Sequence, residues 1–546
     1  MKRFGWLLSG LVVSLALVAL AIYERRTVIG LCGGEYVYPI DDTYIHIAMA
    51  KCLACSGTWG IEPGKMAFCS SSPLWTLVLG GLYRLFGVSE FLPWLLSLLF
   101  NVGLVFVVCR TLAYVRAGLV LQVVGAVCTA VAGPVLNTTA LGMEHAMHAF
   151  FVVATLASAL ALTRGNRVCR VLAPVLAAAA TASRFESMFL LLPVGSLLCL
   201  HGAVRCRRKS DGVTVLAGGL LIVLATVLPV IAYGCWAECH GGHFYPNSLL
   251  LKGEFVLPDV VKKAVVLLSS VDPDLWFVYV LVLALAAVAA LRRTPAVWRL
   301  FAVGVIVAIG GQNLLAAIGQ LCRYEAYLMS TGLFVVVAAL AEGGAGSFPA
   351  AVARVALVLP VMLVFADRAK KSYSETVRGS TDICCQQVLM TRILSELPAD
   401  ARGCVALNDL GYMALHGNFP ILDLWGLGSQ DVTELVLANG KRWTRSAHET
   451  LFKRHDVRYV AVYEEWMPLR LMPRGTVDVA RMTLADNLVC GFDTVVFRAT
   501  SPGDADRLER HLRSYADRLP PRVTMTFCPW RDPSAEETCG GLPQGL

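Results

Sequence analysis

The feature that most constrains the fold is a series of apolar runs, separated by short loops rich in arginine and lysine. A helix of about 20 apolar residues crosses a bilayer, because it satisfies its own backbone hydrogen bonds in the hydrocarbon core. We count about eleven candidate spans of this kind in the first two thirds of the chain. They cover residues 4–23, 91–109, 119–136, 145–162, 171–183, 188–200, 213–235, 275–291, 300–319, 327–340 and 352–365.

The composition agrees with a membrane protein. Of 546 residues, 56% are hydrophobic and 16% are charged, whereas soluble domains are about 25% charged. The net charge of +8 does not indicate a nucleic-acid partner, because the basic residues form short clusters between the apolar runs. The sequence therefore predicts a polytopic α-helical membrane protein.

The first apolar run follows Lys2 and Arg3 and has two interpretations. Ala19, Leu20 and Ala21 resemble the cleavage site of a signal peptide. We prefer an uncleaved signal anchor, since apolar runs continue through the chain and cleavage would detach the following loop from its anchor.

The basic clusters indicate the topology. Pro73–Phe86 is apolar but short and contains Arg84, so we expect a helix that lies in the membrane interface. With this helix on the outer surface and the N-terminus inside, the basic clusters lie in cytoplasmic loops, as the positive-inside rule requires. Counting it as a span would turn them outward. The clusters are Arg110 and Arg116; Arg164, Arg167 and Arg170; Arg205, Arg207, Arg208 and Lys209; and Arg292, Arg293 and Arg299, while Arg25 and Arg26 lie on the wrong side.

The composition becomes more polar after residue 366, which we take as a domain boundary. Residues 386–396 have a helical pattern, and residues 404–407, 420–424 and 457–463 are short apolar runs typical of strands. The sequence therefore predicts a membrane domain over residues 1–366, with a first outer loop at 24–90, and a soluble α/β domain over residues 367–546. An odd number of spans puts the soluble domain outside.

This topology also collects the unusual polar residues on the outer face. Asp41 and Asp42 lie together in the first outer loop, where a charge at the bilayer edge is costly unless it faces water, a ligand or an ion. A solvated helix cap is the alternative for this pair. Four further outer segments carry Glu144 and His145; Arg184 and Glu186; Asn247 and Lys252; and Arg323, Tyr324 and Glu325.

These residue types suit one kind of chemistry. A carboxylate can act as a general base toward a hydroxyl or bind a divalent cation. The cationic side chains of Arg184, Lys252 and Arg323 suit a phosphate, and an interfacial helix would shape a groove open to lipid. Together they predict transfer of a group from a lipid-linked phosphate.

Several motifs also carry a resemblance to a known family. D-D-T-Y-I, G-T-W-G-I-E-P-G, S-S-P-L-W-T, G-M-E, R-F-E, P-N-S and R-Y-E resemble the GT-C superfamily of polyprenyl-phosphate-sugar glycosyltransferases. Within it, the chain is most similar to the branch of the mycobacterial arabinofuranosyltransferases, and more distantly to protein O-mannosyltransferases and the lipid A aminoarabinose transferase. Residues 408–427 resemble the periplasmic domain of the same branch. Relatives often have Arg-Tyr near Ile47–Met49, and R-P-E where this chain has Arg184-Phe185-Glu186, which weakens any statement about the sugar.

The resemblance implies an inverting glycosyltransferase of the bacterial inner membrane, with its active site and C-terminal domain on the periplasmic side. The donor would be a polyprenyl-phosphate sugar, and the acceptor a hydroxyl on an envelope glycan, lipid or protein. Asp41 would be the base, with Asp42 orienting it or holding a cation or a sugar hydroxyl, and Glu144 would be a second acid. No cofactor is implied with certainty; a divalent cation, if one takes part, would be bound by Asp41 and Asp42. Further contacts to the substrate or its phosphate would come from Tyr44, His46, Arg184, Glu186, Asn247, Lys252, Arg323, Tyr324 and Glu325.

Other interpretations remain open at this stage. Cys52, Cys55 and Cys69 suggest a disulfide more than a zinc site, and Cys235 with Cys239 and Cys528 with Cys539 are further disulfide candidates. His46 suits a metal ligand or proton relay as well as a buried histidine. A transporter of lipid-linked sugars is the competing function, although transporters tend to show internal repeats and midplane charges. A catalytically inactive scaffold is a third possibility, and the retained Asp pair argues against it.

Overall fold

The computed structural model describes residues 4–206, 212–252, 275–316, 318–342, 348–398 and 401–529. The chain forms two compact units, each assembled from separate stretches of sequence. The helical unit contains Met1–Gly30, Ser71–Phe244 and Gly253–Val377. The sheet unit contains Leu31–Ser70, Tyr245–Lys252 and Arg378–Leu546. The predicted domain boundary between residues 366 and 367 stays a prediction.

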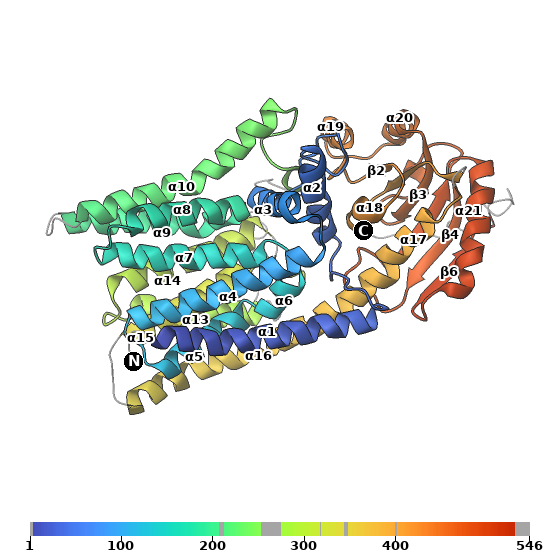
Figure 1. Ribbon diagram of the computed structural model, residues 1–546. Helices are drawn as coiled ribbons and strands as arrows, with labels where there is room; N and C mark the ends of the chain where they lie inside the picture. Colours follow the sequence, from blue (N-terminus) through green and yellow to red (C-terminus); the bar gives the residue numbers. More distant parts are fainter. Residues whose placement is uncertain are drawn as a thin grey trace. The chain divides into compact units, whose positions relative to one another are not determined.

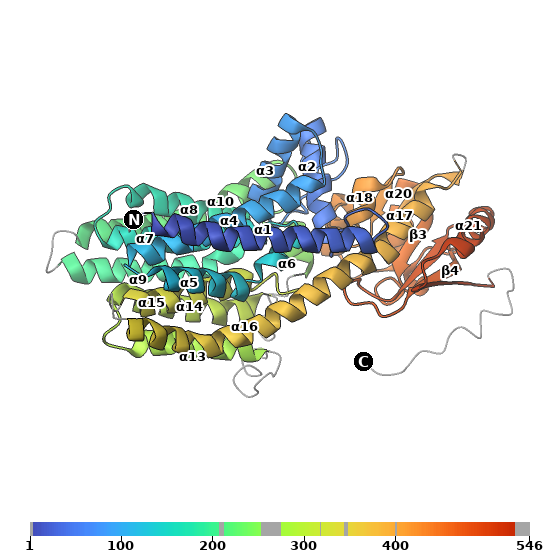
Figure 2. The same ribbon diagram turned by 60° about the horizontal axis from the view of Figure 1, so that its bottom comes forward.

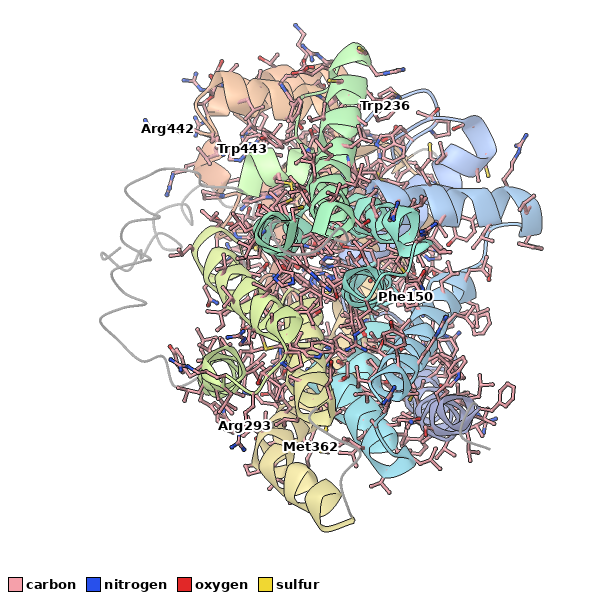
Figure 3. The ribbon with its side chains drawn as sticks, turned by 90° about the vertical axis from the view of Figure 1, so that its left-hand side faces the viewer. Phe150, Trp236, Arg293, Met362, Arg442 and Trp443 are labelled. Carbon is pink, nitrogen blue, oxygen red and sulfur yellow. The ribbon has the colours of Figure 1, made fainter. Side chains whose placement is uncertain are left out.

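The helical unit is a bundle in which α4, α7, α8 and α9 run roughly parallel (Figure 1). Figure 3 views this bundle along its helices and shows Arg293, just after α13, at its periphery. Arg293 is exposed, together with Arg292. The helices are α1 (Gly5–Leu31), α3 (Pro73–Phe86), α4 (Phe91–Tyr114), α5 (Leu119–Ala132), α6 (Val135–Ala140), α7 (His145–Thr163), α8 (Cys169–Ser183), η1 (Phe185–Ser187), α9 (Met188–Cys206), α10 (Gly212–Cys239), α13 (Trp276–Ala290), α14 (Ala296–Leu315), α15 (Ala326–Glu342) and α16 (Phe348–Ile383).

The bundle confirms the expectation of a multi-pass membrane protein. Within the described residues, six helices are long and apolar enough to cross a membrane, and four more are apolar but shorter. The six are Gly5–Leu31, Phe91–Tyr114, His145–Thr163, Phe185–Cys206, Gly212–Cys239 and Ala296–Leu315. The predicted span 119–136 is divided between α5 and α6. The predicted span 352–365 falls within α16, where the side chains of residues 348–358 lie outside the described part.

The short apolar segment Pro73–Phe86 forms α3, as the sequence predicts. Pro73 suits the first helical position because the N–H it lacks would have no partner there. One side of the helix buries Trp75 and Leu79, while Leu85 and Phe86 are exposed. Its position in a membrane interface stays a prediction.

The sheet unit contains a six-stranded sheet of order β2-β1-β3-β5-β4-β6. Figure 2 labels two of its strands, β3 and β4. β1 pairs in parallel with β2 and β3, and the remaining pairs are antiparallel. The predicted strands at 404–407 and 457–463 are confirmed, and the third begins after Pro420, which has no N–H to donate. The strands are β1 (Cys404–Leu407), β2 (Ile421–Asp423), β3 (Val457–Tyr463), β4 (Val477–Leu484), β5 (Thr494–Ala499) and β6 (Val523–Phe527).

Helices from distant parts of the chain complete the sheet unit. The first loop contributes α2 (Asp42–Ser56), which packs against α18 (Gly411–His416). The predicted helix at 386–396 is a π-helical turn, η3 (Cys384–Val388), followed by α17 (Leu389–Ser395). The other elements are α11 (Asn247–Lys252), α19 (Gln430–Ala438), α20 (Arg445–His455), η5 (Leu469–Leu471), α21 (Pro502–Tyr515) and η6 (Ala516–Arg518).

Candidate active site

The first acid of the Asp pair is anchored inside the sheet unit. Asp41 is 8% exposed, and its two carboxylate oxygens accept hydrogen bonds from the backbone N–H groups at the start of α18. The N–H of Tyr412 lies 2.8 Å from Oδ1, and the N–H of Gly411 donates to Oδ2. The unpaired N–H groups of a helix start attract a carboxylate. Asp41 therefore caps a helix start, but the helix is α18 and not α2, which begins at the next residue.

A glycine makes this close approach possible. A Cβ atom at position 411 would lie 2.0 Å from the backbone oxygen of Asp41 and 2.6 Å from its Oδ2. Any side chain at Gly411 would therefore displace the acid from the start of α18.

A second carboxyl group approaches Asp41 from the loop before α18. Asp409 is hydrogen bonded to Asp41, and its Oδ2 accepts from Gln387 Nε2 at 2.6 Å and from the Tyr463 hydroxyl at 2.9 Å. The Tyr463 hydroxyl also lies 2.7 Å from Gln386 Oε1. Because a phenol has one hydrogen, it can serve only one of these two acceptors at a time. The network therefore connects Asp41 to the π-helical turn and to β3.

Burial raises the pKa of the Asp41 carboxyl well above its usual value, and the neighbouring charge of Asp409 raises it further. The hydrogen bonds from Tyr412 and Gly411 act in the opposite direction because they favour the ionised form. A carboxylate with a raised pKa is a stronger base when ionised than an ordinary one.

The raised pKa of Asp41 predicts a pH-dependent stability. Because the folded pKa lies above the unfolded one, the contribution to stability is fully present below the unfolded pKa and is lost as pH rises toward the folded pKa. Asp409→Asn removes one charge beside Asp41 and supplies an amide donor, so we expect the fall in stability as the pH rises above the usual pKa of aspartate to be smaller in this variant than in the wild type. Thermal unfolding of the purified full-length protein, followed by tryptophan fluorescence at several pH values, measures this.

The control for this pH dependence is Asp456→Asn, at an exposed residue of the same unit with φ of 50°. Asparagine tolerates this left-handed conformation, and the variant should keep the pH dependence of the wild type. An equal or steeper fall in the Asp409→Asn variant would show that the carboxyl pair is not the cause.

The remaining first-loop residues lie around α2. Asp42 is the first residue of α2 and is half-buried. The hydroxyl of Tyr44 accepts a hydrogen bond from the N–H of Tyr38 at 2.9 Å, and its ring lies edge-on to Tyr412 with centroids 4.8 Å apart. His46 is buried on the same helix. Asp42, Tyr44 and His46 therefore lie in the first turns of α2, and Asp41 lies directly before this helix.

Asn247 is also in the sheet unit, where its amide holds chain segments together. Its Nδ2 lies 3.4 and 3.3 Å from the carbonyl oxygens of Gly426 and Leu427, and 3.2 Å from Gln430 Oε1. These contacts indicate a structural role in this arrangement. The side chain of Lys252, predicted to contact phosphate, lies outside the described part of the chain.

A second polar cluster lies in the helical unit, where Arg184 sits between two acids. Its Nη1 is 2.6 Å from Glu144 Oε1, and its Nη2 is 2.5 Å from Glu186 Oε1. Glu144 is fully buried at the start of α7, and Arg184 is 6% exposed. The guanidinium also lies 5.5 Å from the centroid of the Tyr324 ring. Two carboxylates offset the charge of Arg184, so its role here is to hold the cluster together.

The R-Y-E segment follows a turn with an unusual backbone. Gly319, Gln320, Leu321 and Cys322 all have positive φ, at 93°, 44°, 57° and 61°. Such conformations cost free energy in residues other than glycine and cluster at functional sites. Arg323, which follows, is buried and donates from Nη2 to the Tyr324 hydroxyl at 3.0 Å.

Glu325 forms an ion pair with an arginine that is distant in the sequence. Its carboxylate pairs with Arg368 of α16 and accepts a hydrogen bond from the N–H of Gly319 at 3.0 Å. Glu325, just before α15, is therefore bonded both to α16 and to the turn with positive φ at residues 319–322. Arg368 was not predicted as a partner, because its position within a long amphipathic helix gives no signal in the sequence.

The predicted site residues thus fall into two groups, one in each unit. Asp41, Asp42, Tyr44, His46 and Asn247 lie in the sheet unit. Glu144, Arg184, Glu186, Arg323, Tyr324 and Glu325 lie in the helical unit. Asp409, Gln387 and Tyr463 were not predicted as site residues, although Asp409 lies in the stretch 408–427 that carries part of the family resemblance.

The structure describes Asp41 and Asp42, which were predicted to bind a divalent cation if one takes part, and most of the cysteines that were predicted to form disulfides. No group of three or more His, Cys, Asp and Glu side chains is placed to hold a metal ion in the ranges that the structure describes. Both oxygens of Asp41 accept hydrogen bonds from backbone N–H groups. Cys52, Cys55 and Cys69 are free thiols: Cys69 Sγ is 3.2 Å from Met49 Sδ and Cys52 Sγ is 3.5 Å from Ser56 Oγ. Cys235, Cys239 and Cys528 are free thiols too, and Cys539 lies outside the described residues.

Comparison with known sequences identifies one domain family. Residues 381–502 match the model of a domain of unknown function (DUF8728). Comparison with curated proteins gives no sequence match.

Solved structures show the similarity of the fold. The oligosaccharyltransferase of Archaeoglobus fulgidus, in complex with zinc and sulfate, aligns with a TM-score of 0.52 and 13% identity over 93% of this chain and 77% of its own. ArnT from Cupriavidus metallidurans in the apo state aligns with a TM-score of 0.52 and 12% identity over 92% and 99%. Both similarities show a GT-C-like fold.

The arabinofuranosyltransferase AftD from Mycobacteria aligns less well. Its TM-score is 0.44, with 15% identity over 89% of this chain and 41% of that chain. This value does not distinguish the mycobacterial branch from the others.

Proposed function

We propose that this protein is an inverting glycosyltransferase that uses a polyprenyl-phosphate sugar as its donor. The observation that carries the proposal is a buried first-loop carboxylate, Asp41, held by backbone N–H groups in a chain with a GT-C-like fold. ArnT from Cupriavidus metallidurans has been observed bound to undecaprenyl phosphate, and we propose a polyprenyl phosphate as the leaving group here.

The proposed reaction is a single displacement. The Asp41 carboxylate takes the proton of the acceptor hydroxyl, and the hydroxyl oxygen attacks the anomeric carbon as the bond to the phosphate oxygen breaks. The configuration inverts, and the polyprenyl phosphate leaves with the electron pair of that bond. Arg323 and Lys252 are the proposed partners of its charge, because Glu144 and Glu186 already offset the charge of Arg184.

The other proposed features follow the family resemblance. Asp42 orients Asp41 or a sugar hydroxyl, Glu144 is a second acid near the acceptor, and Tyr44, His46 and Tyr324 contact the sugars. The acceptor is an envelope glycan, lipid or protein, and the site faces the outer side of a bacterial inner membrane. An arabinofuranosyl donor is the first to test.

The experiment is transfer of radiolabelled sugar from a panel of polyprenyl-phosphate sugars onto total envelope acceptors. We expect membranes that contain the protein to transfer label from one donor, and membranes from a deletion strain not to. If no donor yields transfer, the enzyme proposal fails. Movement of an intact labelled lipid between leaflets of reconstituted vesicles would then support the transporter.

A further inference from the structure

Two cysteines distant in sequence meet in the sheet unit. Cys32 directly follows α1, and Cys384 begins η3. Cys32 Sγ lies 3.7 Å from the carbonyl oxygen of Ser380, and the Cys32 thiol is hydrogen bonded to Cys384. Ser380 and Cys384 are four residues apart, so they lie on the same helix face in consecutive turns. Because a thiol has one hydrogen, Cys32 can donate to only one of these two partners at a time, and both partners lie on the turn that carries Cys384 or just before it.

We propose that Cys32 and Cys384 are a disulfide-forming pair, and that the bond joins the end of the first helix to the start of the C-terminal segment. The Cys32 thiol lies against the helix turn just before Cys384, and disulfides form and persist in oxidising outer compartments. The proposal does not depend on the glycosyltransferase activity. It does require that this part of the chain lies on the outer side.

The two thiols have different reactivities. The hydrogen bond from Cys32 lowers the pKa of Cys384, and the Cys384 side chain is half-buried, so it is the more accessible thiolate. Cys32 is 6% exposed, and the same hydrogen bond and its burial raise its pKa. Cys384 is therefore the attacking thiol, and Cys32 is the resolving one.

The oxidant is a protein disulfide of a thiol–disulfide exchange partner. The Cys384 thiolate attacks one sulfur of that disulfide, which gives a mixed disulfide and releases the other partner sulfur as a thiolate. Cys32 then loses its proton and attacks Cys384 Sγ, so that the second partner sulfur leaves. The two cysteines lose two electrons and two protons, and the partner leaves as a dithiol.

The bond would fix the segment that leads to Asp41. Asp41 lies in the loop just after Cys32, and Gln387, which binds Asp409, lies one turn after Cys384. A covalent link at this point reduces the freedom of both segments that form the carboxyl pair. It would also stabilise the fold, because it closes a long loop in the unfolded chain.

Peptide mapping tests the pair in the full-length protein. Cells that express the protein are treated with N-ethylmaleimide before lysis, and the unreduced protein is digested and analysed by mass spectrometry. We expect a peptide that links Cys32 to Cys384. Recovery of both residues alkylated in the wild type would overturn the proposal, and this result does not require any variant to fold.

Variants provide a second measurement. Cys385 is adjacent to Cys384 in the same turn, so Cys385→Ser is the matched control for Cys384→Ser. We expect dithiothreitol to lower the unfolding temperature of the wild type and of Cys385→Ser by several degrees, and to leave Cys32→Ser and Cys384→Ser unchanged. Equal sensitivity of all four proteins would contradict the proposed pair.

Discussion

Asp41→Asn is expected to reduce sugar transfer by about 10²- to 10⁴-fold, the usual contribution of a general base. Asparagine keeps the size of the side chain but cannot accept the proton of the acceptor hydroxyl. It also has one oxygen where aspartate has two, so one of the N–H groups of Gly411 and Tyr412 loses its acceptor. We therefore expect a further loss of about 1–3 kcal/mol in the free energy of unfolding.

A control must separate these two effects. Asp423, in the same unit, is also a buried acid that accepts two backbone hydrogen bonds, from Trp425 at 2.9 Å and Gly428 at 2.8 Å. Asp423→Asn repeats the chemical change at a position with no proposed catalytic role. We expect it to lose stability while transfer per folded molecule stays near that of the wild type.

Asp42→Asn completes the comparison. Asp42 is half-buried at the start of α2, where an acid stabilises the helix N-terminus, so its replacement should lower the free energy of unfolding by about 0.3–1 kcal/mol. If Asp42→Asn loses transfer by the full amount and Asp41→Asn loses it only in proportion to its instability, Asp42 is the base and Asp41 is an anchor. If both variants match the wild type per folded molecule, the Asp pair has no catalytic role.

The sequence contained enough information for the fold class. Apolar runs and the alternation of short strands with helices depend on local composition, which determines whether a segment is a membrane helix or a buried strand. The helix Pro73–Phe86 and the strand at 404–407 have the predicted limits, which are the limits of two apolar runs in the sequence.

The partners of the site residues could not be predicted in the same way. The contacts of Asp41 with Gly411, and of Glu325 with Arg368, join segments distant in sequence, and no local pattern specifies which segments meet. The short spacing of Cys52 and Cys55 suggested a disulfide, whereas Cys32 and Cys384 are too far apart in the sequence for spacing to indicate a pair. Sequence reasoning identified the reactive residue types, and tertiary structure decides what they contact.

Glu144→Ala is expected to be among the most destabilising changes in the helical unit. It would leave the buried Arg184 with Glu186 as its remaining ion-pair partner in the described structure, and the Glu186 side chain is 25% exposed. Removing one partner of a buried ion pair costs about 3–5 kcal/mol, because the remaining charge stays desolvated. Chemical unfolding of the purified full-length protein measures the loss. The matched change Glu186→Ala should cost less, because water can replace part of that interaction.

A double variant separates support of the fold from chemistry. In Glu144→Leu with Arg184→Leu both buried charges are absent, and an apolar pair of similar size is often as stable as the ion pair it replaces. We therefore expect the double variant to be more stable than Arg184→Leu alone. If Glu144 also acts near the acceptor, the double variant will regain stability without regaining transfer. Recovery of both stability and transfer would show that Glu144 and Arg184 have only a structural role. A double variant that is less stable than either single variant would show that the two charges do not act as a pair.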